Sequence, residues 1–264
     1  MKNTFGIFIA FALICSTAFA HDTWVESGSL AVRKGEYVYV DLRLGNHGNN
    51  HRDFKLASKI TLAPCELSIS RPDGSVEDLK SKLVDTGSAE KEGYWTTRYV
   101  AKQSGVYEVL HKLDTLHGKI RAIKSSKTYF VATDLNATAA AVSIAGQENI
   151  KPHGLGLEMV LETPLDQLAA GSAVRVRLLR NGKPVSDHLV SFIPRGVTLS
   201  EGMDSTYEHK TDSSGLVEFT PSEGNLILAV AHFVADDEKG EAFEKTHYGA
   251  TLVLPVPQRK IADR

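Results

Sequence analysis

Histidine is the residue type whose number and placement in this sequence point most directly to chemistry. The 264-residue chain has ten histidines, and all of them lie after residue 20. Neutral imidazole is a common ligand of divalent transition metals. Five histidines fall in the first half, near the expected ends of strands or in turns, and form the predicted metal-binding set: His21, His47, His51, His111 and His117.

His21 directly follows a segment with the features of an export signal. Residues 1–20 contain an early lysine, a short apolar run and Ala18-Phe19-Ala20, the small residues that a signal peptidase recognises. Cleavage there makes His21 the first residue, whose α-amino group and Nδ1 form a chelate ring on one metal ion. In general these groups titrate near pH ~8 and ~6.5, so they are available at neutral pH. The alternative is that a histidine follows the cleavage site by chance.

The stretch from Gly45 to Asp53 carries His47 and His51 among glycines and asparagines. This composition predicts a loop after a strand, which bends two imidazoles toward one ion. A solvated turn whose histidines face water is the alternative interpretation.

His111 and His117 form a second pair along the chain. Period-two alternation places Tyr107, Val109 and His111 on one face of a strand. We therefore expect His111 to leave the buried face at the end of this strand and His117 to lie in the following turn. A core histidine with one satisfied hydrogen bond is the alternative for either residue.

The remaining chemistry-bearing residues have a structural interpretation. Cys15 is removed with the signal, so Cys65 has no partner for an internal disulfide. We expect Cys65 to be a buried small hydrophobic residue, and it is a minor candidate as a soft metal ligand. The other histidines are interpreted as structural or solvated, with His232 in the core: His153, His188, His209, His232 and His247.

Several classes of function are disfavoured by what the sequence lacks. It contains no nucleophile elbow, phosphate-binding glycine loop, His-Glu-x-x-His or Cys-x-x-Cys motif, so no catalytic residue is predicted. Lys and Arg number 30 against 32 Asp and Glu, which gives no basic field for nucleic acid. The apolar run of the signal is too short to span a bilayer, and we expect no membrane insertion after its removal.

Short alternating runs separated by turn residues make up most of the chain and predict half-buried strands. In the stretch from Tyr37 to Leu44, alternate residues from Val38 are apolar, and Asn181-Gly182 is a strong hairpin signal. Lys124-Ser125-Ser126 is expected to be a turn, and Asp166 to Ala169 one helical turn at most. The expected strands are Tyr37–Leu44, Leu67–Ser70, Tyr94–Val100, Val106–Leu113, Lys127–Ala132, Ala173–Leu179, Val185–Ile193, Leu216–Phe219, Leu226–Phe233 and Tyr248–Val256.

This spacing predicts an all-β protein of two tandem antiparallel β-sandwich domains, immunoglobulin-like or prealbumin-like. The alternation fades in an alanine-rich passage, where we place the boundary. The predicted segments are a signal peptide at 1–20, an N-terminal sandwich with the metal site at 21–133, a linker at 134–154, a C-terminal sandwich at 155–255 and a tail at 256–264.

The expected mature start, His21-Asp22-Thr23-Trp24, resembles an exported domain family described as the periplasmic component of nickel or cobalt uptake systems. Val32-Arg33-Lys34-Gly35-Glu36, Gly93-Tyr94-Trp95-Thr96 and Ser104-Gly105-Val106-Tyr107 extend the resemblance to about residues 21–255. It implies periplasmic binding of a divalent transition metal without catalysis, and delivery to an inner-membrane permease. This sequence departs from the family pattern by placing histidine first instead of second or third.

The leading hypothesis is therefore an exported, periplasmic or secreted protein that binds Ni, Co, Cu or Zn through the five histidines and supports handling of the ion. One alternative is a non-catalytic structural or adhesion module whose histidines are incidental. A second is a copper oxygenase with an amino-terminal histidine brace, which is disfavoured because the sequence has only two tryptophans and no evident sugar-binding face.

Overall fold

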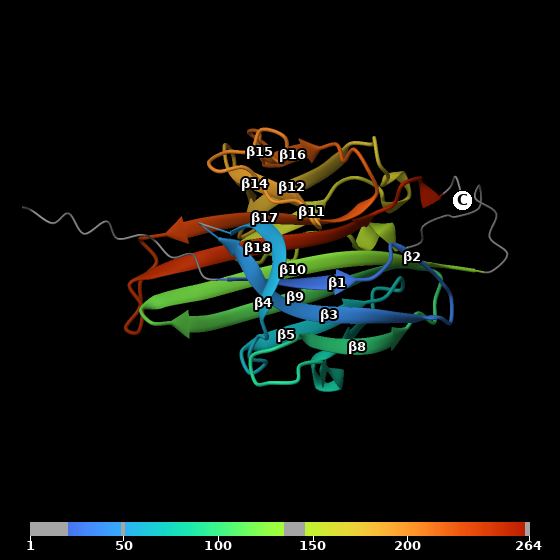
Figure 1. The fold of residues 1–264 in the computed structure, drawn as a ribbon, viewed down its shortest axis with the longest axis horizontal. Coiled ribbons are helices and arrows are strands. Elements are labelled where there is room, and N and C mark those ends of the chain that lie inside the picture. The colour runs from blue at the N-terminus through green and yellow to red at the C-terminus, as the bar shows by residue number, and fades with distance from the viewer. Residues whose placement is uncertain (1–20, 49–50, 135–145, 262–264) are drawn as a thin grey trace, which may run out of the picture.

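The structure is a computed structural model that describes residues 21–48, 51–134 and 146–261. It consists of three β-sheets in layers, with a long central sheet between two smaller ones (Figure 1). The predicted signal, most of the linker and residues 262–264 of the tail lie outside the described residues. Within the described ranges, no helix has the length and apolar character needed to cross a membrane.

The central sheet has nine strands and takes them from both predicted halves of the chain. In pairing order they are β15 (Glu208–Lys210), β14 (Leu189–Pro194), β17 (Asn225–Ala235), β18 (Lys245–Val256), β10 (Ile120–Thr133), β9 (Gly105–His117), β5 (Cys65–Ser70) and β6 (Val76–Asp78), with β2 (Ala31–Arg33) also pairing with β10. The halves are joined by the parallel pair β10 and β18, whose register runs from Ile120↔Lys245 to Thr128↔Val253.

Two smaller sheets cover the central sheet. The N-terminal sheet contains β1 (Asp22–Ser27), β3 (Tyr37–Gly48), β8 (Trp95–Val100) and β7 (Val84–Asp85), with β4 (His51–Ser58) beside β3. The C-terminal sheet contains β11 (Glu158–Leu161), β12 (Val174–Arg180), β13 (Lys183–Pro184) and β16 (Leu216–Phe219). Three short 3-10 helices lie in the described connections: η1 (Lys80–Lys82), η3 (Gln147–Asn149) and η4 (Leu165–Gln167).

Alternation along β10 explains why the smaller sheets lie on opposite faces of the central sheet. Phe130 and Ala132 belong to the core under the N-terminal sheet. Tyr129 and Val131 belong to the core under the C-terminal sheet. Successive side chains of a strand point to opposite faces, so one strand supplies both cores. The predicted antiparallel sandwich class is confirmed, and the two sandwiches share the central sheet.

The expected alternation in the first long strand is also confirmed. Val38, Val40 and Leu42 are buried, whereas Tyr37 and Tyr39 are exposed. The hairpin at Asn181-Gly182 joins β12 to β13, and both of its residues have positive φ. The short helical turn is present as η4.

Two predicted turns are wrong. Lys124 to Ser126 lie inside β10, where the Ser125 hydroxyl donates to the Leu157 carbonyl oxygen at 2.6 Å and thus stays satisfied in a buried strand. In the stretch predicted as a loop, residues 45–48 belong to the end of β3 and residues 51–53 to the start of β4. Gly45 is needed there because a Cβ atom would lie 2.0 Å from Cη2 of Trp24.

The free edge of β1 lies on the central sheet and is hydrogen-bonded by side chains. The Val25 amide donates to the Ser126 hydroxyl at 2.9 Å, and the Thr251 hydroxyl donates to the Thr23 carbonyl oxygen at 2.9 Å. An edge strand otherwise presents unpaired backbone groups, which are costly when buried. These hydroxyls therefore fix the position of β1 across the central sheet.

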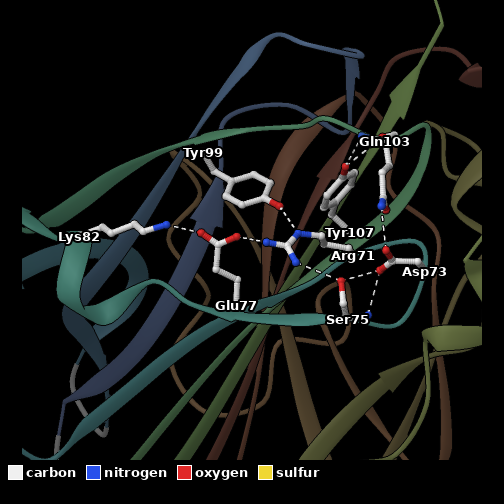
Figure 2. A network of polar contacts seen from close by, with 8 residues as sticks. All are labelled: Arg71, Asp73, Ser75, Glu77, Lys82, Tyr99, Gln103 and Tyr107. Atoms are coloured by element: carbon white, nitrogen blue, oxygen red, sulfur yellow. Dashed lines mark hydrogen bonds and ion pairs between the residues drawn. The ribbon is translucent and has the colours of Figure 1, made fainter.

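A polar network at the turn between β5 and β6 stabilises the N-terminal sandwich at the end of β5 that lies away from the start of β1 (Figure 2). Arg71 donates from Nε to the Tyr99 hydroxyl at 3.0 Å and forms an ion pair with Glu77. Gln103, in the turn between β8 and β9, donates to Asp73 at 2.7 Å. These contacts hold β5, β6, β8 and the turn before β9 together, away from the residues considered below.

A buried ion pair connects β10 to the first residue of β11. Lys127 Nζ lies 2.8 Å from Glu158 Oε2, and both side chains are almost fully buried. Glu158 also accepts backbone N–H bonds from residues 153–155. Burial raises the pKa of Glu158, but attraction to Lys127 and the backbone donors outweighs it, so the net pKa is lowered.

We expect Glu158→Gln to lower the free energy of unfolding by about 3–5 kcal/mol, because Lys127 is left as an uncompensated buried charge. Urea denaturation at pH 7 measures this loss. The contribution of Glu158 to the free energy of unfolding is complete above the ordinary pKa of a glutamate. It is lost as pH falls through the lowered pKa that Glu158 has in the folded protein. Glu218→Gln, in a pair with Arg175 whose side chains are about half exposed, is the control and should cost at most about 1 kcal/mol. Equal effects of the two variants would contradict the prediction.

Candidate functional site

A cavity of about 800 Å³ opens beside the start of β1. Its lining includes His21, Thr23 from β1, His117 from the end of β9 and Lys124 from β10. The other polar lining residues are Ser58, Lys59, Thr61, Asp85, Glu90, Lys91 and Thr115, and the apolar ones include Leu44, Ile60, Leu62, Trp95, Leu113 and Leu116. Strands of the N-terminal and central sheets thus bring two of the predicted histidines to one cavity.

The backbone at His21 is held by Lys124. The Lys124 ammonium donates to the His21 carbonyl oxygen, and Nζ lies 3.6 Å from Oδ1 of Asp22. Burial lowers the pKa of Lys124, and the Asp22 carboxylate opposes that shift without cancelling it. The first residues of β1 are therefore anchored by a side chain of the central sheet.

Asp22 is almost fully buried and is also paired with His232. His232 Nε2 lies 2.9 Å and 3.0 Å from the two carboxylate oxygens of Asp22. The His232 carbonyl oxygen in turn lies 2.6 Å from Nε2 of His188, a ring whose pKa is lowered by burial. The start of β1 is thus tied to β17 as well as to β10.

His111 on β9 is fully buried, not at the edge of the buried face as expected. Its Nδ1 is 2.9 Å from the Glu66 carbonyl oxygen, and its Nε2 is 3.1 Å from the Thr23 hydroxyl. A carbonyl oxygen only accepts, so Nδ1 carries the proton and Nε2 accepts from Thr23. Both ring nitrogens are engaged, and His111 offers none to a metal in this arrangement.

The other predicted ligands have different surroundings. His21 is exposed, and His117 is the exposed last residue of β9 instead of a turn residue. His47 and His51 lie on the backbone at the end of β3 and the start of β4, but their side chains are outside the described part of the chain. Among the side chains that are described, no group of three or more His, Cys, Asp or Glu residues is arranged to hold a metal.

Sequence reasoning missed Asp22, Lys124 and His232. A lysine and a histidine inside buried strands are an available signal, because such groups are rarely buried without partners. Asp22, the common partner of Lys124 and His232, is 210 residues from His232 in the sequence, so residue spacing could not identify it. Cys65 is buried in β5 as expected, and burial raises the pKa of its thiol to about 11.

The comparisons with known proteins give a family for this chain. Residues 18–234 match the family described as Domain of unknown function (DUF4198). The chain belongs to the DUF4198 family. No function is attached to that description, and the nickel or cobalt role implied by resemblance gains no support from it. A comparison with curated protein sequences found no match.

Solved structures similar to this DUF4198 protein are distant. The D0-D1 domain of intimin has 14% identity and a TM-score of 0.24, with 88% of this chain and 97% of that chain covered. A DUF4785 family protein from Legionella pneumophila has 11% identity and a TM-score of 0.29, covering 78% and 51%. Fibronectin(III)-like modules of Clostridium thermocellum CbhA have 11% identity and a TM-score of 0.23, covering 88% and 94%.

The burial of His111 predicts a pH-dependent stability. Burial lowers its pKa from 6.5 to about 4, so the folded state binds the proton less readily than the unfolded state. The stabilisation is complete above pH 6.5 and is lost as pH falls toward 4. We expect about 2 kcal/mol of this loss between pH 8 and pH 5, measured by urea denaturation.

His111→Gln is the matched variant, since its amide keeps a donor and an acceptor, and it should remove this part of the pH dependence. NMR titration of the ring protons gives an independent check. A midpoint near 6.5 for His111 would contradict the assignment.

Proposed function

We propose that this DUF4198 protein is exported and binds a divalent transition metal, Ni, Co, Cu or Zn, at its processed amino terminus. The observation that carries the proposal is that His21 and His117 line the same cavity. After cleavage behind Ala20, His21 supplies the α-amino nitrogen and Nδ1, and His117 supplies a third nitrogen. Such a nitrogen-rich donor set suits these ions.

The anchoring of His21 supports the chelate. Its two nitrogens come from one residue, so binding is stronger when the backbone of that residue is already ordered. The hydrogen bond from Lys124 to the His21 carbonyl oxygen and the pairing of Asp22 with Gly45 provide this order. His111 contributes by orienting Thr23 and not as a direct ligand.

The hairpin of β3 and β4 is the proposed source of further ligands. The last pair between β1 and β3 is Asp22↔Gly45, so β3 continues past the start of β1 toward His47. His51 pairs with Gly48 at the start of β4. Under this proposal the hairpin carries His47 and His51 to the ion, and a permease of the inner membrane receives it.

Metal titration by calorimetry on protein that begins at His21 tests the proposal. One added alanine before His21 removes the chelate and leaves the fold unchanged. We expect one-to-one Ni²⁺ binding that weakens at least ~10-fold, or ~1.4 kcal/mol, in the extended protein. Equal or absent binding in both would favour a structural module with incidental histidines.

His117→Gln should also weaken Ni²⁺ binding, because it removes a nitrogen ligand from the cavity. His209→Gln is the matched control, since His209 lies on edge strand β15 and contacts the Thr206 carbonyl oxygen. Affinity should fall from pH 8 to pH 6 in the unmodified protein, because protons compete for imidazole and amine nitrogens. An affinity that is flat over this range would rule out the ligand set.

A further inference from the structure

The outer face of the N-terminal sheet carries two exposed tyrosines. Tyr37 and Tyr39 lie on β3, and 54% and 60% of their surface is exposed. Val38 between them enters the core, so alternation directs both tyrosines outward, roughly 7 Å apart along the strand. The two rings therefore form an aromatic surface that the described side chains leave open to solvent.

Arg98 on β8 joins the two rings into one cluster. β3 and β8 lie side by side (Figure 1), and their register places Arg98 directly opposite Tyr39. The guanidinium carbon of Arg98 lies 4.3 Å from the centre of the Tyr37 ring, which is the contact of a cation with an aromatic face. The tyrosine-arginine cluster, formed by Tyr37, Tyr39 and Arg98, thus presents two rings and one positive charge on the same face.

No carboxylate of the described residues balances the charge of Arg98. Its side chain is exposed, and its contact there is the ring of Tyr37. Arg43, further along the same face of β3, lies 2.7 Å from Asp41 and 3.3 Å from Glu26, and its side chain is only 16% exposed. A guanidinium binds a carboxylate through two parallel N–H···O bonds. Charge complementarity therefore favours an acidic partner at the cluster.

The composition of the cluster favours an acidic sugar over an acidic protein. The centre of a protein interface is depleted in charged residues, whereas here a guanidinium lies beside both rings. The C–H groups of a sugar ring carry partial positive charge and pack on the negative face of an aromatic ring. A uronic acid polymer supplies a ring and a carboxylate in every unit, so it offers a partner to each member of the cluster.

We infer that the tyrosine-arginine cluster binds an acidic polysaccharide of the uronic acid class, whose carboxylate pairs with Arg98 and whose sugar rings pack on Tyr39 and on the exposed part of Tyr37. This adds a second type of ligand to the proposed function. The cluster shares no residue with the proposed metal site, so either can fail without the other.

Calorimetry with three probes tests the inference on protein that begins at His21, without added metal. The probes are a short oligogalacturonate, its methyl ester and an oligoglutamate of the same length. We expect the ester and the peptide to bind at least about 10-fold more weakly than the oligogalacturonate, because one lacks the carboxylates and the other lacks the rings. Added NaCl should weaken binding of the oligogalacturonate, since the charged contact is exposed.

Two variants remove the ring and the charge separately. Tyr39→Ser and Arg98→Gln should each weaken binding of the oligogalacturonate at least about 5-fold. Both residues are exposed, and urea denaturation checks that the fold is kept. The matched controls are Leu189→Ser, an exposed position on β14, and Arg175→Gln, an exposed arginine on β12, and neither should change the affinity.

Several outcomes would overturn the inference. Equal binding of the oligogalacturonate and the oligoglutamate means that charge alone is sufficient. Absent binding, or binding that Tyr39→Ser and Arg98→Gln leave unchanged, means that the cluster is not a sugar site. A dimer in sedimentation that Tyr39→Ser dissociates means that a second copy covers this face. In each case, the Ni²⁺ titration of the alanine-extended protein still decides the proposed function.

Discussion

The contact of β1 with the central sheet is the interaction on which the site depends. β1 pairs with β3 on one side only, and its other edge is satisfied by hydroxyls and by Lys124 from the central sheet. Without these groups, the buried backbone of an edge strand would carry unpaired donors and acceptors. The same contacts bring the residue that begins the proposed mature chain to a cavity between two sheets.

The shared central sheet gives this contact a rigid base. β10 supplies alternate side chains to two cores, and its parallel pairing with β18 links the first half of the chain to the last strand. The buried Lys127–Glu158 ion pair connects β10 to β11, and the contact of His232 with Asp22 connects β17 to β1. Because each pair spans segments far apart in sequence, the site and the fold are stabilised together.

The histidines divide by environment. His111 is buried with both nitrogens engaged, and His232 is paired with Asp22, so these two hold β1 in place. His21 and His117 are exposed at the cavity. A common residue type thus has two roles here, and the difference comes from burial and from the partner of each ring nitrogen.

The sequence by itself determined the all-β class, the buried face of the first long strand and the Asn181-Gly182 hairpin, because these follow from local alternation and turn chemistry. It also singled out His21 as a candidate metal ligand, because this residue follows a signal-like segment. Only the tertiary structure decided that Lys124 to Ser126 continue a strand, that His111 is buried, and that Asp22, Lys124 and His232 meet. The physical reason is that hydrogen bonds and ion pairs between distant strands satisfy polar groups that local patterns assign to turns or to solvent.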